Sequence, residues 1–417
     1  MNFYAEPAFF ILLVPIVGIA MLLGVNEKPL GRYGLGASVL MLLLLFSRSI
    51  ESLVFFVCYL VFSLGLARWV AGMFSETART DKASADELKD ESDGAASGRT
   101  PHPRRVALYR IALALQIAPL AVYKVGVLFQ PDFLGFIGIS YITFKAVQVL
   151  IEIRDGLIKD LGALEYLYFL VFFPTITSGP ILRSRKFVDD LNAKRTRDEY
   201  LQLLYRGAGW FMLGALYKFV GAPIGQWAMW FLPSVIGTAT PAAAVGANVV
   251  YALGYTLYLF FDFAGYSHMA VGLGYALGIE VPRNFRAPFL AIDIKDFWNR
   301  WHISLSTWLR DFVFMRFSAA AIEHKWFKSS VTTACIGFVL NMTLMGIWHG
   351  LTVDYLVYGL YHGLLLASCE LMQRKWGFYK KHRRETWFKL CSWAVTMVAI
   401  VFGMALFSGQ VFHNPLG

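Results

Sequence analysis

Apolar runs are distributed over the whole chain, and most approach the length that crosses a lipid bilayer. Eleven of them cover residues 8–24, 34–47, 51–73, 106–128, 133–151, 162–178, 204–222, 243–263, 331–348, 353–372 and 390–412. A transmembrane helix needs about 20 apolar residues, and only a helix or a closed barrel satisfies its backbone hydrogen bonds in hydrocarbon. With 57% hydrophobic residues, the sequence predicts an all-α polytopic membrane protein with about eleven spanning helices.

The remaining segments predict how the protein is organised around these spans. Runs 265–278 and 227–245 are short or broken by glycine, which predicts re-entrant or interfacial helices. Residues 75–105 mix both charges with Ala, Ser and Gly and have no apolar periodicity, which predicts a flexible polar loop. We expect residues 1–417 to form a single membrane-embedded domain that carries this loop.

The charge distribution predicts which loops face the cytosol. The net charge is +10, and segments 183–206 and 374–389 carry seven Lys or Arg residues each. By the positive-inside rule, both segments lie on the cytosolic side. The four cysteines lie in apolar runs without CxxC spacing, which argues against a disulfide framework or a zinc site.

One histidine closes an apolar run. Residues 331–348 are almost wholly apolar and are followed by His349, with Gly346 and Gly350 on either side. An ionisable side chain at membrane depth is costly, so it is a functional candidate by default. The alternative is a histidine that anchors the helix end in the headgroup layer beside Trp348.

A second histidine lies in the polar segment 296–317. At 100° per residue, aromatic and apolar side chains gather on one arc of a helix, and Lys295, Asn299, His302, Ser306 and Arg310 line the opposite stripe. This pattern predicts one amphipathic helix along an interface or a wet cavity. His302 falls at the border, where it is either functional or a polar residue on a surface helix.

Several common chemistries have no motif in this chain. No G-x-S-x-G, P-loop, H-E-x-x-H or G-x-G-x-x-G in a dinucleotide-binding context occurs. What remains is histidine acid–base chemistry without a metal or bound cofactor, such as acyl transfer from a thioester to an alcohol. A second imidazole or the Asn299 side chain would stabilise the developing oxyanion.

Four strings carry a family resemblance. They are GISYITFK at 138–145, FPTITSGP at 173–180, DFWNRWH at 296–302 and MGIWHG at 345–350. Through them the chain resembles the membrane-bound O-acyltransferase (MBOAT) family. The resemblance implies a central tunnel, His349 as the catalytic base and His302 as its partner. It further implies that the tunnel is lined by Trp298, Asn299, Ser306 and Trp348.

Two more strings point to a branch of the family. NFRAPFL at 284–290 and WLRDFVFMRF at 308–317 resemble the branch that D-alanylates teichoic acids. The alginate O-acetyltransferase branch shares the histidine motifs and is the alternative. Leu182, where the D-alanylation branch is expected to have an acidic residue, and the long 75–105 loop depart from its pattern.

The resemblance also implies partners. The acyl donor would be a thioester on the phosphopantetheine arm of a cytosolic carrier protein. The acceptor would be a hydroxyl of a cell-envelope polymer outside a bacterial plasma membrane, with an accessory membrane protein as an intermediate acceptor and no nucleic acid. Carrier proteins are generally acidic, so we expect docking at Phe314, Met315, Arg316 and Phe317, which mix apolar and basic contacts.

Two functions from other classes remain open on the residues alone. His302, His349 and Asp262 could form the proton relay of a transporter or flippase, or the protein could be a scaffold that recruits partners. The tryptophan-bordered histidine motifs and the lack of a visible inverted repeat favour an acyl-transfer site over alternating access.

Overall fold

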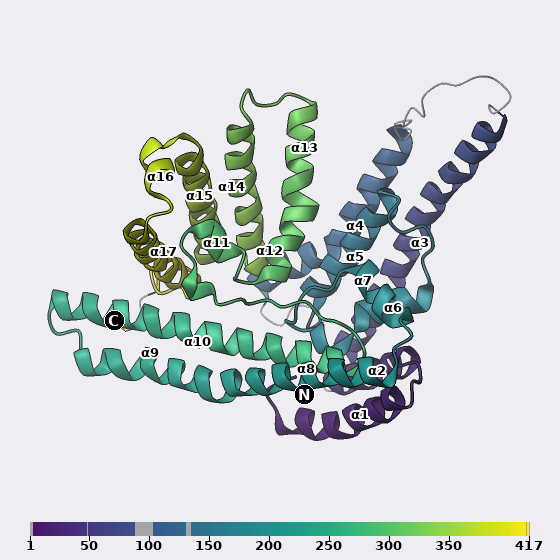
Figure 1. Cartoon of the computed structure of the whole chain (residues 1–417), viewed down its shortest axis with the longest axis horizontal. Helices are drawn as coiled ribbons and strands as arrows, with labels where there is room; N and C mark the ends of the chain where they lie inside the picture. Colours follow the sequence, from purple (N-terminus) through teal and green to yellow (C-terminus); the bar gives the residue numbers. More distant parts are fainter. Residues whose placement is uncertain (1–2, 48, 88–102, 131–134, 414, 417) are drawn as a thin grey trace. The chain divides into compact units, whose positions relative to one another are not determined.

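The computed structural model describes residues 3–47, 49–87, 103–130, 135–413 and 415–416 (Figure 1). Every regular element among these residues is a helix, which confirms the predicted all-α class. The described residues form two compact units: Met1–Ser178 with Leu182–Tyr200 and Leu277–Ile279, and Gly179–Ile181 with Leu201–Ala276 and Glu280–Gly417.

Among the described residues, the first unit contains seven α-helices and one 3-10 helix. They are α1 (Pro7–Val25), α2 (Gly31–Leu45), α3 (Ile50–Glu87), α4 (Pro103–Phe129), α5 (Ile139–Arg154), α6 (Ala163–Val171), η2 (Phe173–Thr175) and α7 (Ser184–Asn192). Because α3 continues to Glu87 and α4 begins at Pro103, residues 75–87 and 103–105 of the predicted 75–105 loop are helical. The rest of the predicted loop, 88–102, lies outside the described residues.

The string GISYITFK has a structural role in this unit. Lys145 is almost completely buried on α5, and its Nζ donates to the carbonyl oxygens of Phe169 and Leu170 at 3.0 and 3.4 Å. It also donates to Oγ1 of Thr175 at 3.4 Å. These acceptors lie where α6 ends, so Lys145 satisfies carbonyls that the helix itself leaves unpaired.

The second unit contains most of α8 and all later α-helices. Its elements are α8 (Arg197–Leu216), η3 (Tyr217–Gly221), α9 (Ala222–Ile236), α10 (Pro241–Ala276), η4 (Pro288–Leu290), α11 (Ile294–Trp298), α12 (Ile303–Leu309), η5 (Arg310–Phe314), α13 (Met315–Glu323), α14 (Ser330–His349), α15 (Val353–Lys375), α16 (Gly377–His382) and α17 (Thr386–Phe407). Helices α9 and α10 run side by side, as do α13 and α14 (Figure 1).

The two predicted re-entrant runs lie on long helices and the turn between them. Run 265–278 covers the last turns of α10, and run 227–245 covers the end of α9, residues 237–240 and the start of α10. Residues 197–236 form one continuous helical stretch with a π-helical turn at η3, and α10 continues through 265–276. Glycines explain why these helices stay regular and close. A Cβ on Gly265 would lie 2.6 Å from the Lys218 backbone nitrogen, and one on Gly254 would lie 2.5 Å from Met229 Cα. The glycines therefore serve backbone-to-backbone packing.

The number of spans differs from the prediction. Among the described residues, seven helices are long and apolar enough to cross a membrane: 7–25, 50–74, 103–129, 197–236, 241–276, 330–349 and 386–407. The two predicted runs in α2 and α6 form shorter apolar helices. Helix α15 is absent from this set, and it buries the polar side chains of Asp354, His362 and Glu370. The chain is therefore a multi-pass membrane protein, but the count of eleven is not confirmed.

Candidate functional site

The predicted amphipathic helix 296–317 is broken at the second histidine. Helix α11 ends at Trp298, α12 begins at Ile303, and His302 has left-handed backbone angles of φ 45° and ψ 48°. The polar stripe that a continuous helix would carry therefore does not form. Instead of lying on a polar surface, the His302 side chain is turned into the protein and is 3% exposed.

The break brings the two histidines to one cavity. It has a volume of about 50 Å³ and is lined by Leu259, Phe263, Trp298, Trp301, His302, Met345, His349, Tyr358, Met404 and Phe407. All of these residues belong to the second unit. Ligand pockets are usually several hundred Å³, so this cavity admits water or a small group but does not enclose a long acyl chain.

His349 is the last residue of α14 and is surrounded by aromatic rings. Its ring centroid lies 4.6 Å from that of Trp348 and 5.0 Å from that of Phe407, which is perpendicular to it. Tyr355 and Tyr358 on α15 lie 6.0 and 6.4 Å away. Three helices therefore define the space that this imidazole occupies.

His302 is more deeply buried than His349. The Phe263 ring is perpendicular to it at 4.7 Å, and the Trp348 ring is 6.4 Å away. Burial and, to a lesser extent, the proximity of His349 lower the pKa of His302 to about 3. The imidazole is therefore neutral near pH 7. Its Nδ1 is buried and has no hydrogen-bond partner from another residue.

The other predicted tunnel residues have different positions. Trp298 lines the cavity, and its buried Nε1 has no hydrogen-bond partner. Trp348 does not line it but packs near both histidine rings. Asn299 is exposed at the end of α11, and Ser306 donates to the Trp301 carbonyl at 3.2 Å. Neither of these two lines the cavity, because the helix break changes the faces on which they lie.

Sequence reasoning missed several residues of this cavity. Phe263, Tyr358 and Phe407 come from α10, α15 and α17, and no local motif marked them. His362 on α15 is fully buried next to these residues. Its ring lies 5.3 Å from that of Trp298, at 89°, and 4.7 Å from that of Tyr358, at 68°. The only sequence signal was the spacing of aromatic residues on α15, which does not distinguish a cavity from a core.

The segment predicted to dock a carrier is mostly packed against its own unit. Phe314 stacks on Phe338 of α14 at 4.9 Å, and Phe317 lies 6.0 Å from Trp326. Met315 is different, because 55% of it is exposed. Ile322, about two turns further along α13, is 64% exposed, so the outward face of α13 is apolar.

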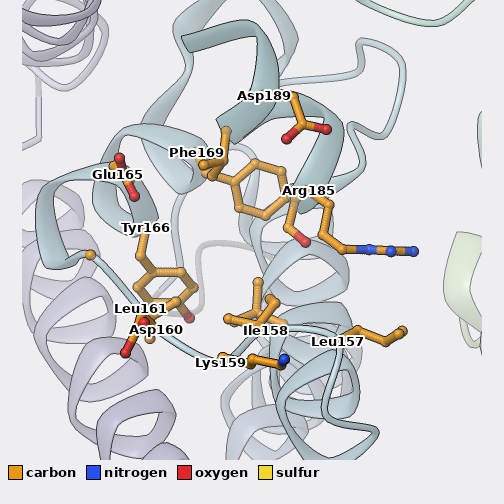
Figure 2. A pocket seen from close by; sticks show the side chains of 14 residues that line it. Leu157, Ile158, Lys159, Asp160, Leu161, Glu165, Tyr166, Phe169, Arg185 and Asp189 are labelled. Atoms are coloured by element: carbon orange, nitrogen blue, oxygen red, sulfur yellow. The ribbon is translucent and has the colours of Figure 1, made fainter. Parts of the chain in front are cut away.

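A larger pocket of about 360 Å³ lies in the first unit and contains none of the predicted site residues. It is lined by α5, α6, α7 and the 157–162 segment. Figure 2 shows the rings of Tyr166 and Phe169 within it, with Glu165 and Asp189 on one side and Lys159 on the other. Within the described part of the chain, no group of three or more His, Cys, Asp or Glu side chains could hold a metal ion.

The chain thus combines membrane helices with two histidines that line one cavity among aromatic side chains. This combination can be compared with known protein families. Residues 102–409 match the membrane-bound O-acyltransferase family, and the chain belongs to this family. The protein is therefore an O-acyltransferase, which favours an enzyme over the transporter and the scaffold.

Within this family, the chain is similar to members of two branches. The chain is 38% identical to the teichoic acid D-alanyltransferase of Bacillus subtilis, over 99% of both chains. It is 43% identical to that of Lacticaseibacillus rhamnosus, over 73% of this chain and 76% of the relative. Identity to a probable alginate O-acetylase of Pseudomonas syringae is 32%, over 66% of this chain and 49% of the relative.

Proposed function

We propose that this protein transfers a D-alanyl group from a carrier-protein thioester to a hydroxyl acceptor that leads to teichoic acid, at a bacterial plasma membrane. The observation that carries the proposal is the cavity shared by His302 and His349. Likeness over nearly the whole chain to a teichoic acid D-alanyltransferase supports the D-alanyl group over acetyl. The alginate relatives match a smaller part of the chain.

His349 acts as the general base in this proposal. It takes the proton of the acceptor hydroxyl while that oxygen attacks the thioester carbonyl carbon. When the tetrahedral intermediate collapses, the C–S bond breaks, the ester forms, and the proton returns to the leaving thiolate. The reaction is balanced without an oxidant, a metal or a bound cofactor. The acceptor hydroxyl belongs either to the polymer or to an accessory membrane protein that passes the group on.

His302 and Trp298 complete the site. His302 is neutral, so its imidazole can orient the reacting groups by hydrogen bonding without adding a charge. The free Nε1–H of Trp298 can donate to the oxyanion, a role for which Asn299 is badly placed. The Trp348 ring lies 6.4 Å from the His302 ring and 4.6 Å from the His349 ring, so it packs beside both imidazoles.

The exposed face of α13 is the proposed docking surface for the carrier. It is centred on Met315 and extends to Ile322, with Arg316 on the same helix. The net charge of +10 would attract an acidic carrier and raise the association rate. Phe314 and Phe317 would support this surface from below, since they pack against neighbouring residues.

The test is acyl transfer by purified protein in liposomes. Carriers loaded with radiolabelled D-alanine or acetate are added outside, and label is measured on teichoic acid, on an accessory protein and on alginate. We expect D-alanyl transfer by the wild type and none by His349→Ala, while the matched control His413→Ala, at an exposed histidine near the C-terminus, keeps its rate. Transfer by His349→Ala at the wild-type rate would remove the general-base role. Acetyl transfer to alginate instead would replace the proposed substrate.

A further inference from the structure

The backbone of His302 is held in an unusual conformation. Left-handed angles are rare for a residue with a β-carbon, and the structure around it must compensate for their cost. His302 lies between α11, which ends at Trp298, and α12, which begins at Ile303. The conformation therefore persists only if neighbouring groups hold the chain on both sides of this residue.

Asn284 holds the chain after His302. Its backbone oxygen accepts from the Ile303 nitrogen at 2.9 Å, and its Oδ1 accepts from the Ser304 nitrogen at 3.2 Å. The Ser304 hydroxyl also donates to this Oδ1 at 2.6 Å. The His302 side chain does not cap α12, so Asn284 satisfies the first N–H groups of that helix from a distant segment.

Asn284 is itself fixed in place. It is fully buried, and its Nδ2 donates to Oγ of Ser267 on α10 at 3.2 Å. Two residues further on, the Arg286 nitrogen donates to the carbonyl oxygen of Arg300 at 3.0 Å. Residues 284–286 thus form hydrogen bonds to the chain before and after His302, and Asn284 joins that chain to α10.

The His302 ring depends on this backbone for its direction. Its Nδ1 has no hydrogen-bond partner from another residue, and its ring neighbours, Phe263 and Trp348, make non-directional aromatic contacts. A catalytic imidazole is usually oriented by a hydrogen bond to its second nitrogen. Here the orientation is set through the main chain.

We propose that Asn284 is a positioning residue of the acyl-transfer site, which holds the backbone at His302 and so directs its imidazole into the cavity shared with His349. The proposal rests on the proposed function of His302 in acyl transfer. An asparagine suits the place because one amide supplies an acceptor for two donors of Ser304 and a donor for Ser267. Alanine would leave these buried groups unpaired.

The first test is a double-mutant cycle on acyl transfer. Asn284→Ala should lower kcat by about 10- to 100-fold, since misplacing a reacting group by about 1 Å has an effect of this size, and should leave KM for the carrier within about twofold. In a His302→Gln background the same substitution should cost less than about twofold, because its target is gone. An equal loss in both backgrounds would overturn the proposal.

A second variant, Ser304→Ala, tests the same proposal if Asn284→Ala does not fold. Ser304→Ala removes the hydroxyl that donates to Oδ1 and accepts from the Ile181 nitrogen at 2.9 Å, and it leaves the backbone donor to Oδ1, so it should lower kcat in the same direction by a smaller factor. Thr256→Val is the matched control, because the buried Thr256 hydroxyl donates to the Ala252 carbonyl within α10 and contacts neither Asn284 nor residues 303–304 through a hydrogen bond. A loss in Thr256→Val as large as that in Ser304→Ala would contradict the proposed role.

Nitrogen-15 NMR of histidine-labelled protein separates this proposal from the proposed function. Asn284→Ala should shift the ring signals of His302 and leave those of the exposed His324 unchanged. Unshifted His302 signals in a folded variant would overturn the positioning role. Shifted signals together with full activity of His302→Gln would support the positioning role and refute only the part of His302 in catalysis.

Discussion

The close contact between α14 and α15 should set the position of His349. The substitution Gly359→Ala, which adds one methyl group at this contact, tests that expectation. Gly359 of α15 faces Gly346 of α14, one turn before His349. A Cβ added to Gly359 would lie 2.5 Å from the Met342 carbonyl oxygen and 3.1 Å from Gly346 Cα. These are backbone atoms, so no flexible side chain can move aside.

The size of the effect follows from these distances. The 2.5 Å separation must grow to at least 3.4 Å for ordinary contact, so the helices must separate by about 0.9 Å in Gly359→Ala. Overpacking of this kind costs about 1–3 kcal/mol, partly offset by about 1 kcal/mol of helix propensity. Displacing the His349 imidazole by about 1 Å should lower the acyl-transfer rate by about 100-fold.

The assay compares initial rates of D-alanyl transfer and melting temperatures for Gly359→Ala and a control. Gly209→Ala in α8 is matched, because nothing lies within 4 Å of a Cβ at that position. The control should keep its rate and be as stable as the wild type or more so. A Gly359→Ala protein that transfers at the wild-type rate would refute the reasoning that this helix contact positions His349.

Two further predictions concern pH and carrier binding. The pKa of His302 is about 3 in the native protein, and the ordinary value for histidine is 6.5. Between pH 6.5 and pH 3 the unfolded chain therefore binds a proton at this side chain that the native protein does not bind. The free energy of unfolding therefore falls as the pH falls through this range. From pH 7.5 to 5 the wild type should lose about 2 kcal/mol more of unfolding free energy than His302→Gln in detergent; parallel pH profiles would show that His302 is not held neutral. Met315→Glu should raise KM for an acidic carrier by about tenfold with kcat unchanged, because it places a like charge on the proposed docking surface. An unchanged KM, measured beside Ile292→Glu as a control on another exposed apolar side chain, would move the docking surface elsewhere.

Much of the fold could be predicted because apolar length is a local property. Each of the eleven apolar runs overlaps a helix of the structure, although runs 133–151 and 162–178 extend beyond α5 and α6, since a backbone in hydrocarbon has few alternatives. What could not be predicted was where one helix ends and the next begins. The π-helical turn at 217–221 joins two segments that composition alone separates, and the polar residues buried on α15 depend on partners from other helices.

The candidate site likewise has residues that the sequence could identify and residues that it could not. His349 could be singled out from the sequence, because an ionisable side chain after a long apolar run is costly wherever the run packs. Asn299 was misplaced, because periodicity assumes that the helix continues. Arg300, Ile303 and Ser304 form hydrogen bonds with residues 284 and 286. No local sequence pattern predicts hydrogen bonds between segments so far apart.

The sequence by itself determined that this is a helical membrane protein and that His349 is its leading catalytic candidate, because both follow from the cost of exposing polar groups to lipid. Only the tertiary structure decided that His302 is buried beside the same cavity. The reason is that hydrogen bonds with Asn284 and Arg286, which lie far away in the sequence, hold the chain on both sides of this left-handed residue.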